Sequence, residues 1–274
     1  MNNLIQRIVT AIILAVFIFS LVSLGGLGFI LLIMTINFLG LFEFYRLFDS
    51  QMLSPRRITG TIFSSIILGT SLLTTMGIST KFVLLANIPA AFIIFIAELY
   101  LKAKDPFLNI AITFLGVISI TIPLCFFFCT AYLPLRSGTY HKEIILGIFY
   151  ILWASDSGAY FIGKFLGKRP LFKRISPNKT WEGSIGGGLF AICVAFFISK
   201  FYSFYNTTDW LLIALIVVVA GPFGDLVKSM MKRSLGLKDS GTILPGHGGI
   251  IDRFDTLLSS CPFICSYLIL SRNV

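Results

Sequence analysis

Apolar stretches long enough to cross a lipid bilayer dominate this sequence. A membrane-spanning helix needs about 20 predominantly apolar residues, because the hydrocarbon core is about 30 Å thick and each helical residue rises about 1.5 Å. We find nine such stretches, over residues 8–24, 26–45, 58–76, 82–101, 108–133, 144–163, 184–204, 210–228 and 250–270. Charged residues make up only 12% of the chain, too few to cover this apolar surface in water. The sequence therefore predicts an all-α, polytopic integral membrane protein with about nine transmembrane helices, and it excludes one soluble domain.

The positions of the basic residues predict how the chain is oriented. Cytoplasmic loops of membrane proteins retain Lys and Arg. With a cytoplasmic N-terminus and nine crossings, 17 of the 22 Lys and Arg residues fall on the cytoplasmic side. The net charge of +10 favours anionic lipid or a phosphorylated ligand as partner rather than nucleic acid, because no soluble basic domain is present to bind it.

Charged residues concentrate in two windows of the second half, residues 153–183 and 221–255, which together hold half of all Lys and Arg residues. No internal repeat or long linker separates independent domains. We therefore predict a transmembrane helical scaffold over residues 1–150 and a transmembrane catalytic region with cytoplasmic loops over residues 151–274.

The first window opens with an acidic residue, Asp156, inside an apolar stretch. A carboxylate there costs about 2.5 to 3.5 kcal/mol on insertion, so we expect it to face a wet cavity or a cation. A purely structural pairing with a basic side chain is the alternative. The segment SPNKTWEG then runs into the next helix. Ser176 and Thr180 are candidate helix caps, and free N–H groups of a helix N-terminus beside Lys179 form a phosphate site. The other basic residues of this loop are typical of an ordinary positive cytoplasmic loop.

The second window begins where GPFG, residues 221–224, interrupts an apolar stretch just before Asp225. This pattern is typical of discontinuous membrane helices that direct backbone groups at a ligand. At helical spacing Asp225, Lys228 and Lys232 share one face. A solvated charged face is the alternative, but the stripe lies at the end of an apolar span, which favours a site.

A glycine-rich segment, LPGHGG over residues 244–249, follows Lys238 and Asp239. Glycines allow positive φ and let backbone N–H groups approach an anion. Asp252 and Asp255 are three residues apart and project together from the first turns of the last helix. Interaction with the helix dipole is the simpler role for them, but the charged groups of this window are more numerous than a helix cap requires.

The residue types in these windows favour Mg²⁺ and polyphosphate over zinc, which prefers His and Cys ligands. Nucleotidyl transfer needs positioning, a metal ion that bridges phosphate oxygens, and cations that neutralise developing charge. The window lies at a membrane surface, so a phosphorylated lipid is the natural second substrate. The hard oxygen ligands are Asp225, Asp239, Asp252 and Asp255.

The second window resembles the signature of the phosphatidate cytidylyltransferases, also called CDP-diacylglycerol synthases. That signature has the form S-x-x-K-R-x4-K-D-x-G, followed by Pro-Gly-His-Gly-Gly and D-R-x-D. Upstream, DSGAYFIGKFLGK and SPNKTWEGSIGG are also similar to family segments, so the resemblance covers residues 153–260. The matching signature residues are Ser229, Lys232, Arg233, Lys238, Asp239, Gly241, Pro245, Gly246, His247, Gly248, Gly249, Asp252, Arg253 and Asp255.

The resemblance implies conversion of CTP and phosphatidic acid to CDP-diacylglycerol and pyrophosphate. It further implies a homodimer, and Mg²⁺ on Asp225 and Asp252 with K⁺ beside it. The distribution of Lys and Arg predicts that the active site faces the cytoplasm, in a bacterial inner or plasma membrane. From the chemistry we expect direct attack by the phosphatidate phosphate, without a covalent enzyme intermediate. We assign catalysis to Asp225, Lys232, Arg233, Lys238, Asp239 and Asp252, and charge neutralisation also to Lys179. We assign metal binding to Asp225, Asp252 and Asp255. We assign substrate contacts to Asp156, Ser176, Lys179, Thr180, Lys228, Ser229, His247, Gly248, Gly249 and Arg253.

Two other functions stay open from the sequence. A CTP-dependent lipid-alcohol kinase would use similar parts but release CDP instead of pyrophosphate. An ion-coupled transporter of phosphorylated solutes would also suit a broken helix with an intramembrane carboxylate, although the inverted repeat common in transporters is missing from the sequence.

Overall fold

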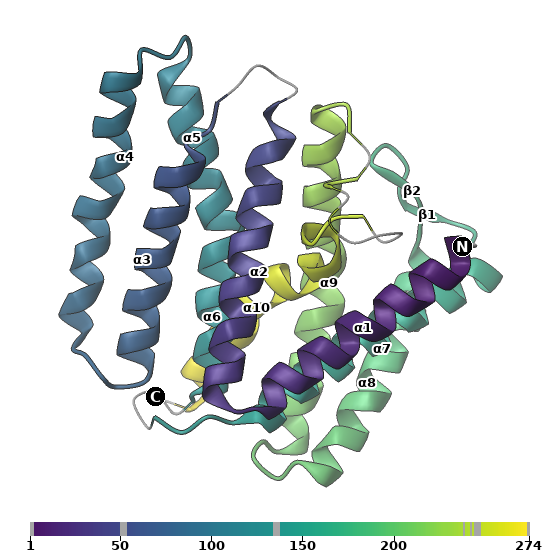
Figure 1. Ribbon diagram of the computed structural model, residues 1–274. Helices are drawn as coiled ribbons and strands as arrows, with labels where there is room; N and C mark the ends of the chain where they lie inside the picture. Colours follow the sequence, from purple (N-terminus) through teal and green to yellow (C-terminus); the bar gives the residue numbers. More distant parts are fainter. Residues whose placement is uncertain are drawn as a thin grey trace. The chain divides into compact units, whose positions relative to one another are not determined.

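Long helices make up nearly all of the computed structural model (Figure 1), which describes residues 3–49, 54–133, 138–237, 239–241, 243 and 248–272. Eight helical segments of this described part are long and apolar enough to cross a membrane, and a shorter apolar helix covers Ile8–Ser23. The prediction of an all-α polytopic protein with about nine spans is therefore confirmed.

The helices begin and end close to the predicted limits. The first half contains α1 Asn3–Ser23, α2 Gly26–Leu47, α3 Arg57–Thr75, η2 Lys81–Ala86, α4 Asn87–Leu101, α5 Pro106–Gly116, η3 Val117–Thr121 and α6 Ile122–Ala131. The second half contains α7 Lys142–Leu166, β1 Pro170–Phe172, β2 Ser176–Thr180, α8 Trp181–Phe201, α9 Thr207–Ser234 and α10 Ile251–Arg272.

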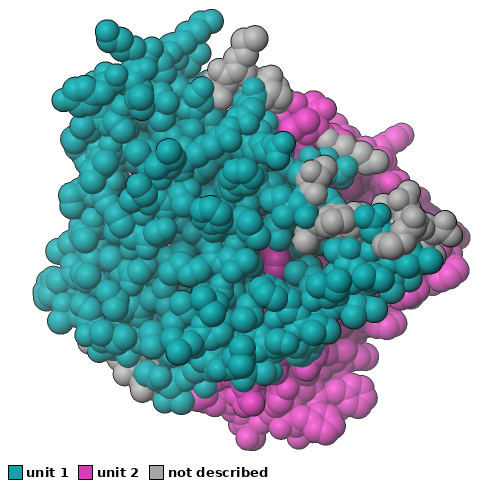
Figure 2. Space-filling view, viewed as in Figure 1, with its two compact units in different colours: residues 1–140, 239–253, 274 teal, residues 141–238, 254–273 magenta. Residues whose placement is uncertain are grey.

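Packing divides the chain into two compact units, coloured separately in Figure 2. The first unit comprises residues 1–140 and 239–253, and the second comprises residues 141–238 and 254–273. The boundary near the C-terminal end falls within α10, between Arg253 and Phe254. These units are defined by packing, and the division at residue 150 into scaffold and catalytic region stays a prediction.

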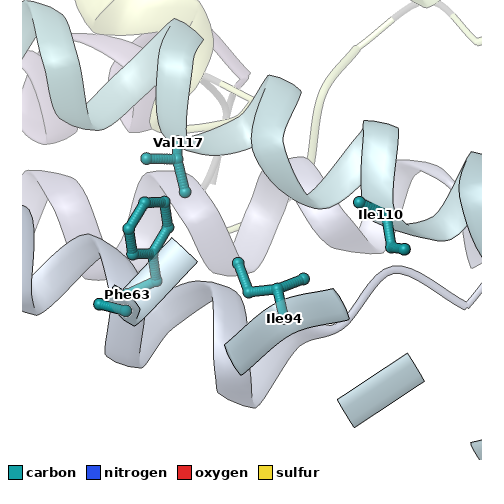
Figure 3. Packing of buried hydrophobic residues seen from close by; sticks show 5 residues of the cluster. Phe63, Ile94, Ile110 and Val117 are labelled. Carbon is teal, nitrogen blue, oxygen red and sulfur yellow. The ribbon is translucent and has the colours of Figure 1, made fainter. Parts of the chain in front are cut away.

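A cluster of apolar side chains from α3, α4, α5 and η3 forms part of the core of the first unit (Figure 3). Phe63, Ile94, Ile110 and Val117 are buried in it, and the ring of Phe63 meets Phe114 edge to face with centroids 5.7 Å apart. Lipid tails are as apolar as these side chains, so close van der Waals packing, rather than removal from water, holds such helices together.

The fifth span contains a wide π-helical turn, η3, between α5 and α6. Pro123 lies in the first turn of α6, directly after η3. A buried triangle of hydrogen bonds holds the end of the turn: Thr121 Oγ1 bonds Asn37 Oδ1 at 2.8 Å, Asn37 Nδ2 bonds Ser64 Oγ at 2.6 Å, and the two hydroxyls lie 2.9 Å apart.

In the second unit, small residues let α7 and α8 approach closely. A Cβ atom on Gly158 would lie 2.8 Å from the ring of Phe190, and one on Gly187 would lie 2.6 Å from the carbonyl oxygen of Ser155. Close backbone approach at glycines is the usual way in which membrane helices gain contact. The glycines of the segment GSIGGG in α8 therefore serve helix packing.

The prediction of a discontinuous helix before Asp225 is wrong, because α9 runs unbroken over Thr207–Ser234 with Pro222 inside it. The flanking glycines explain the pattern instead. A Cβ on Gly221 would lie 2.6 Å from Thr256 Cγ2, and one on Gly224 would overlap the side chain of Ser259, both on α10. The sequence GPFG marks a close helix crossing within the second unit, and membrane helices tolerate its proline.

A short antiparallel hairpin, β1–β2, connects α7 to α8, with Pro170 opposite Thr180 and Phe172 opposite Ser176. The all-helical prediction did not include it. Two hydrogen bonds attach the chain just before the hairpin to the first turn of α8: the backbone N–H groups of Lys168 and Arg169 both donate to Glu182 Oε2 at 3.1 Å.

Candidate active site

The second unit contains a cavity of about 410 Å³, a size typical of small-molecule sites. Side chains from α7, β2, α8, α9 and α10 line it, so residues of both predicted windows meet there. The lining residues include Ser155, Asp156, Tyr160, Lys164, Asn178, Lys179, Thr180, Ser184, Pro222, Asp225 and Thr256.

An ion pair between Lys179 of β2 and Asp225 of α9 lies at this cavity. The exposed fractions of the two side chains are 31% and 24%, so both are only partly shielded from solvent. Ser229, one helical turn after Asp225, donates its hydroxyl to the other carboxylate oxygen at 3.3 Å. Asp225 and Ser229 therefore lie on the same side of α9, and the segment SPNKTWEG supplies the opposing cation, Lys179.

Further charges surround the Lys179 ammonium. Burial lowers the pKa of Lys179, whereas the carboxylates of Asp255 and Asp156 raise it and the nearby Lys232 lowers it. Charges from three different elements, α7, α9 and α10, thus act on the ammonium group of Lys179 in β2. The structure brings these residues together although Asp156 and Asp255 are widely separated in sequence.

Thr180 caps α8, as predicted: its hydroxyl accepts the backbone N–H of Gly183 at 3.1 Å. Ser176, the other predicted cap, is not one, because it begins β2 and pairs with Phe172. The chain turns from α7 into the hairpin so tightly that a Cβ on Gly167 would lie 2.7 Å from Thr180 Oγ1. This close packing fixes β2 beside the start of α8 and holds Lys179 at the cavity.

The basic residues of α7 and α9 differ in their distance from the cavity and in their exposure to solvent. Lys164, which the sequence assigned to an ordinary positive loop, lies in the last turn of α7 and lines the cavity. Arg233 is exposed, and its guanidinium donates to the carbonyl oxygen of Leu237 at 3.3 Å, so it closes the C-terminal end of α9. Lys232, by contrast, is buried and Lys228 is half-buried.

Asp252 and the residues around it lie in the first unit. Its Oδ2 accepts the backbone N–H of Ser240 at 3.0 Å and lies 2.8 Å from the Ser240 hydroxyl. Gly248 has φ +84°, a conformation that favours glycine, and a Cβ on it would lie 3.4 Å from Asp252 Oδ2. Gly249 is buried, while Asp239 and Arg253 are exposed. Lys238 and His247 lie outside the described residues.

Sequence reasoning missed Glu43, which joins this group. It lies on α2, is 2% exposed, and accepts the backbone N–H groups of Ile250 at 2.7 Å and Ile251 at 3.3 Å. The signal was present, because Glu43 is an acidic residue inside an apolar span. The argument that singled out Asp156 applies to it equally.

The arrangement of the acidic side chains determines whether they could bind Mg²⁺. Among the residues that the structure describes, no three Asp, Glu, His or Cys side chains gather closely enough to hold a metal ion. Mg²⁺ seldom needs such a cage, because one or two carboxylates commonly bind it together with water and substrate phosphates. Asp225 and Asp255, whose oxygens are hard ligands at one cationic point, fit that mode. Asp252 belongs to the other unit, and a metal ion shared by Asp225 and Asp252 stays a prediction.

Comparison with known proteins identifies the family. The chain matches the cytidylyltransferase family model over residues 5–271. It is 35% identical over 270 residues to the phosphatidate cytidylyltransferase of Bacillus subtilis (strain 168), an alignment covering 96% of this chain and 97% of that protein. Identity to the protein of that name from Staphylococcus aureus (strain COL) is 35% over 268 residues, covering 97% and 99% of the two chains. The resemblance of the motifs is thus confirmed over nearly the whole length, and the chain belongs to the cytidylyltransferase family.

Proposed function

We propose that this protein transfers the cytidylyl group of CTP to phosphatidic acid, giving CDP-diacylglycerol and pyrophosphate for phospholipid synthesis. The similarity over nearly the full length to proteins named phosphatidate cytidylyltransferase carries the proposal. The cavity with the Lys179–Asp225 ion pair supports it, because a triphosphate and a hard cation need these two kinds of charge at one place.

The reaction is a direct displacement at phosphorus. A phosphate oxygen of phosphatidic acid forms a bond to the α-phosphorus of CTP, and the bond from that phosphorus to the β-bridging oxygen breaks. Pyrophosphate leaves with the electron pair. The attacking phosphate is already anionic near neutral pH, so the protein needs no general base and mainly supplies positioning and charge neutralisation.

The cationic side chains hold the triphosphate. Lys179 lies at the cavity, and the phosphates of CTP would compete with Asp225 for its ammonium. This exchange would leave the Asp225 carboxylate available to a cation. We assign charge neutralisation also to Lys232, Arg233 and Lys238, and we assign substrate contacts to Asp156, Ser176, Thr180, Lys228, Ser229, His247, Gly248, Gly249 and Arg253.

We propose Asp225, Asp252 and Asp255 as the residues that hold Mg²⁺, with Asp239 acting beside them. Bound there, Mg²⁺ would draw negative charge from the phosphate oxygens and make the α-phosphorus easier to attack. The carboxylate chemistry and the family resemblance support this assignment, and the resemblance alone supports a K⁺ ion nearby.

We further propose that the N-terminus and the active site face the cytoplasm and that the protein forms a homodimer in the bacterial plasma membrane. The excess of Lys and Arg on one side of the predicted spans supports the orientation. The dimer rests on the family resemblance.

The reaction is tested with the purified full-length protein in lipid nanodiscs, given phosphatidic acid, Mg²⁺ and CTP labelled at the α-phosphate. We expect the label in the extracted lipid and one pyrophosphate released for each labelled lipid. In a parallel reaction with CTP labelled at the γ-phosphate, label in the lipid with release of CDP would instead identify a lipid kinase. Uptake of a phosphorylated solute into sealed vesicles without chemical turnover would identify a transporter.

A further inference from the structure

The buried carboxylate of Glu43 on α2 is the feature of the first unit that the motifs do not explain. It lies four residues before Leu47, the last residue of the helix, and is among the least exposed charged side chains of the described chain. We infer that Glu43 is a positioning residue for cytidylyl transfer: it fixes Asp252 through Ser240 and through the first backbone amides of α10.

The backbone contacts of Glu43 locate the start of α10. The N–H of Ile250 donates to Oε2 at 2.7 Å and the N–H of Ile251 donates to Oε1 at 3.3 Å. The first N–H groups of a helix have no partner within the helix, and a carboxylate there also interacts favourably with the helix dipole. Glu43 therefore sets where the helix that carries Asp252 begins, from a helix more than 200 residues earlier in the chain.

The hydroxyl of Ser240 extends this contact to Asp252 itself. It donates to Oε1 of Glu43 and lies 2.8 Å from Oδ2 of Asp252, which also accepts the Ser240 backbone N–H at 3.0 Å. The two carboxylates therefore share one serine. A shift of Glu43 would move Ser240 and, with it, both contacts that orient Asp252.

The glycines of the family signature close around the same carboxylate. A Cβ on Gly249 would overlap Oε1 of Glu43, and a Cβ on Gly241 would lie 3.0 Å from its Cδ. These two glycines are thus needed for close approach to Glu43. A helix cap alone would not require both chain segments to fold onto the carboxylate, so the arrangement points to the placement of Asp252 as its role.

The inference rests on the proposed role of Asp252, and the experiment separates the two. Full-length Glu43→Ala and Glu43→Gln proteins are compared with the parent in nanodiscs by hydrogen–deuterium exchange of the segment around Ile250 and Ile251, and by kcat with its dependence on Mg²⁺ concentration. Glu98→Gln is the matched control, because Glu98 is also a buried acid of the first unit, 4% exposed, and bonds Arg56 and Asn109 instead.

We expect Glu43→Ala to expose the two amides to exchange, to lower kcat about 10- to 100-fold, and to raise the Mg²⁺ concentration for half-maximal rate. Glu43→Gln keeps one carbonyl oxygen as acceptor and should recover part of each effect. Glu98→Gln should leave kcat and the Mg²⁺ requirement of the folded protein within about twofold of the parent.

Unchanged exchange and kcat in Glu43→Ala would overturn the inference, and so would equal kinetic losses in Glu98→Gln, which would indicate general destabilisation. Faster exchange in Glu43→Ala together with full activity in Asp252→Asn would refute the proposed role of Asp252 and therefore the positioning role built on it. The cytidylyl transfer reaction itself would stand in that case.

Discussion

The two units use buried polar groups in different ways. In the first unit, the carboxylate of Glu98 is bonded by Arg56 and Asn109, and that of Glu43 by backbone N–H groups and a serine. In the second unit, Asp225 and Lys179 pair at the wall of a cavity and remain partly exposed. A polar group in a membrane protein needs a partner in either case. The comparison indicates that Glu43 and Glu98 of the first unit have internal partners, whereas Lys179 and Asp225 of the second unit stay accessible at a cavity, as our proposal of a ligand there requires.

The largest effect should follow from Asp225→Asn, which tests whether the cavity charges act in the reaction. Asparagine still accepts the Ser229 hydroxyl but loses the charge that we propose for metal binding. We expect turnover to fall roughly 10²- to 10³-fold, as for loss of one preorganised electrostatic contact, with insertion and purification unchanged. Asp209→Asn is the control on the same helix, because Asp209 accepts the Tyr267 hydroxyl at 2.7 Å and does not line the cavity. Equal turnover in the two variants would remove Asp225 from the reaction.

A smaller effect is expected for Lys179→Gln, which removes the cation of the same pair. A hydrogen bond to a charged group contributes about 1.5 to 3 kcal/mol, so the KM for CTP should rise about 10- to 100-fold. Lys179→Arg keeps the positive charge and should give an intermediate KM. Initial rates at saturating phosphatidic acid measure this, and a parent-like KM in Lys179→Gln would contradict the assignment of Lys179 to the triphosphate.

Gly224→Ala tests whether the second unit depends on the close crossing of α9 and α10. The added methyl group would overlap Ser259, and such overpacking costs about 1 to 3 kcal/mol. We expect a lower temperature of thermal unfolding in detergent and reduced turnover, because Asp225 is the next residue. Gly69→Ala on α3 is the matched control: nothing lies within 4 Å of its added Cβ, so the helix should be unchanged or slightly more stable. Equal unfolding temperatures would show that the crossing tolerates a side chain.

The smallest effect should come from Ser64→Ala in the first unit, which removes the shared hydroxyl of the Asn37–Ser64–Thr121 triangle. Hydrogen bonds between membrane helices contribute about 0.6 kcal/mol on average. We expect a slightly lower unfolding temperature and unchanged kinetic constants. A large loss of turnover would show that the Asn37–Ser64–Thr121 triangle also acts in catalysis.

The helices could be predicted from sequence because bilayer thickness fixes their length and the absence of water fixes their composition. Thr180 was predictable as a cap because a cap is a local feature. The β1–β2 hairpin was not, since its few residues carry no apolar alternation, and the sequence GPFG fits a broken helix as well as a close crossing until Thr256 and Ser259 are seen beside it.

The candidate site could be predicted only in part, because its residue types are local features of the sequence and their spatial arrangement is not. The residue types at Asp225, Lys179 and Asp255 indicated phosphate chemistry, but their meeting at one ammonium depends on how α9, β2 and α10 pack. Glu43 could be noticed as an acid in an apolar span, yet its partners lie about 200 residues later, where no local pattern connects them.

The wide turn at Val117–Thr121 determines where the fifth span can lose a residue. A π turn holds one residue more than an α-helical turn, and one residue corresponds to about 100° of rotation about the helix axis. Deleting one residue within the turn would convert it to a regular helical turn that ends at nearly the same angle. Deleting one residue from the regular helix before it would instead rotate all of Ile122–Ala131 and turn the fully buried Phe127 and Phe128 away from their neighbours. A one-residue gap should therefore be tolerated at this turn and not in the regular helix before it.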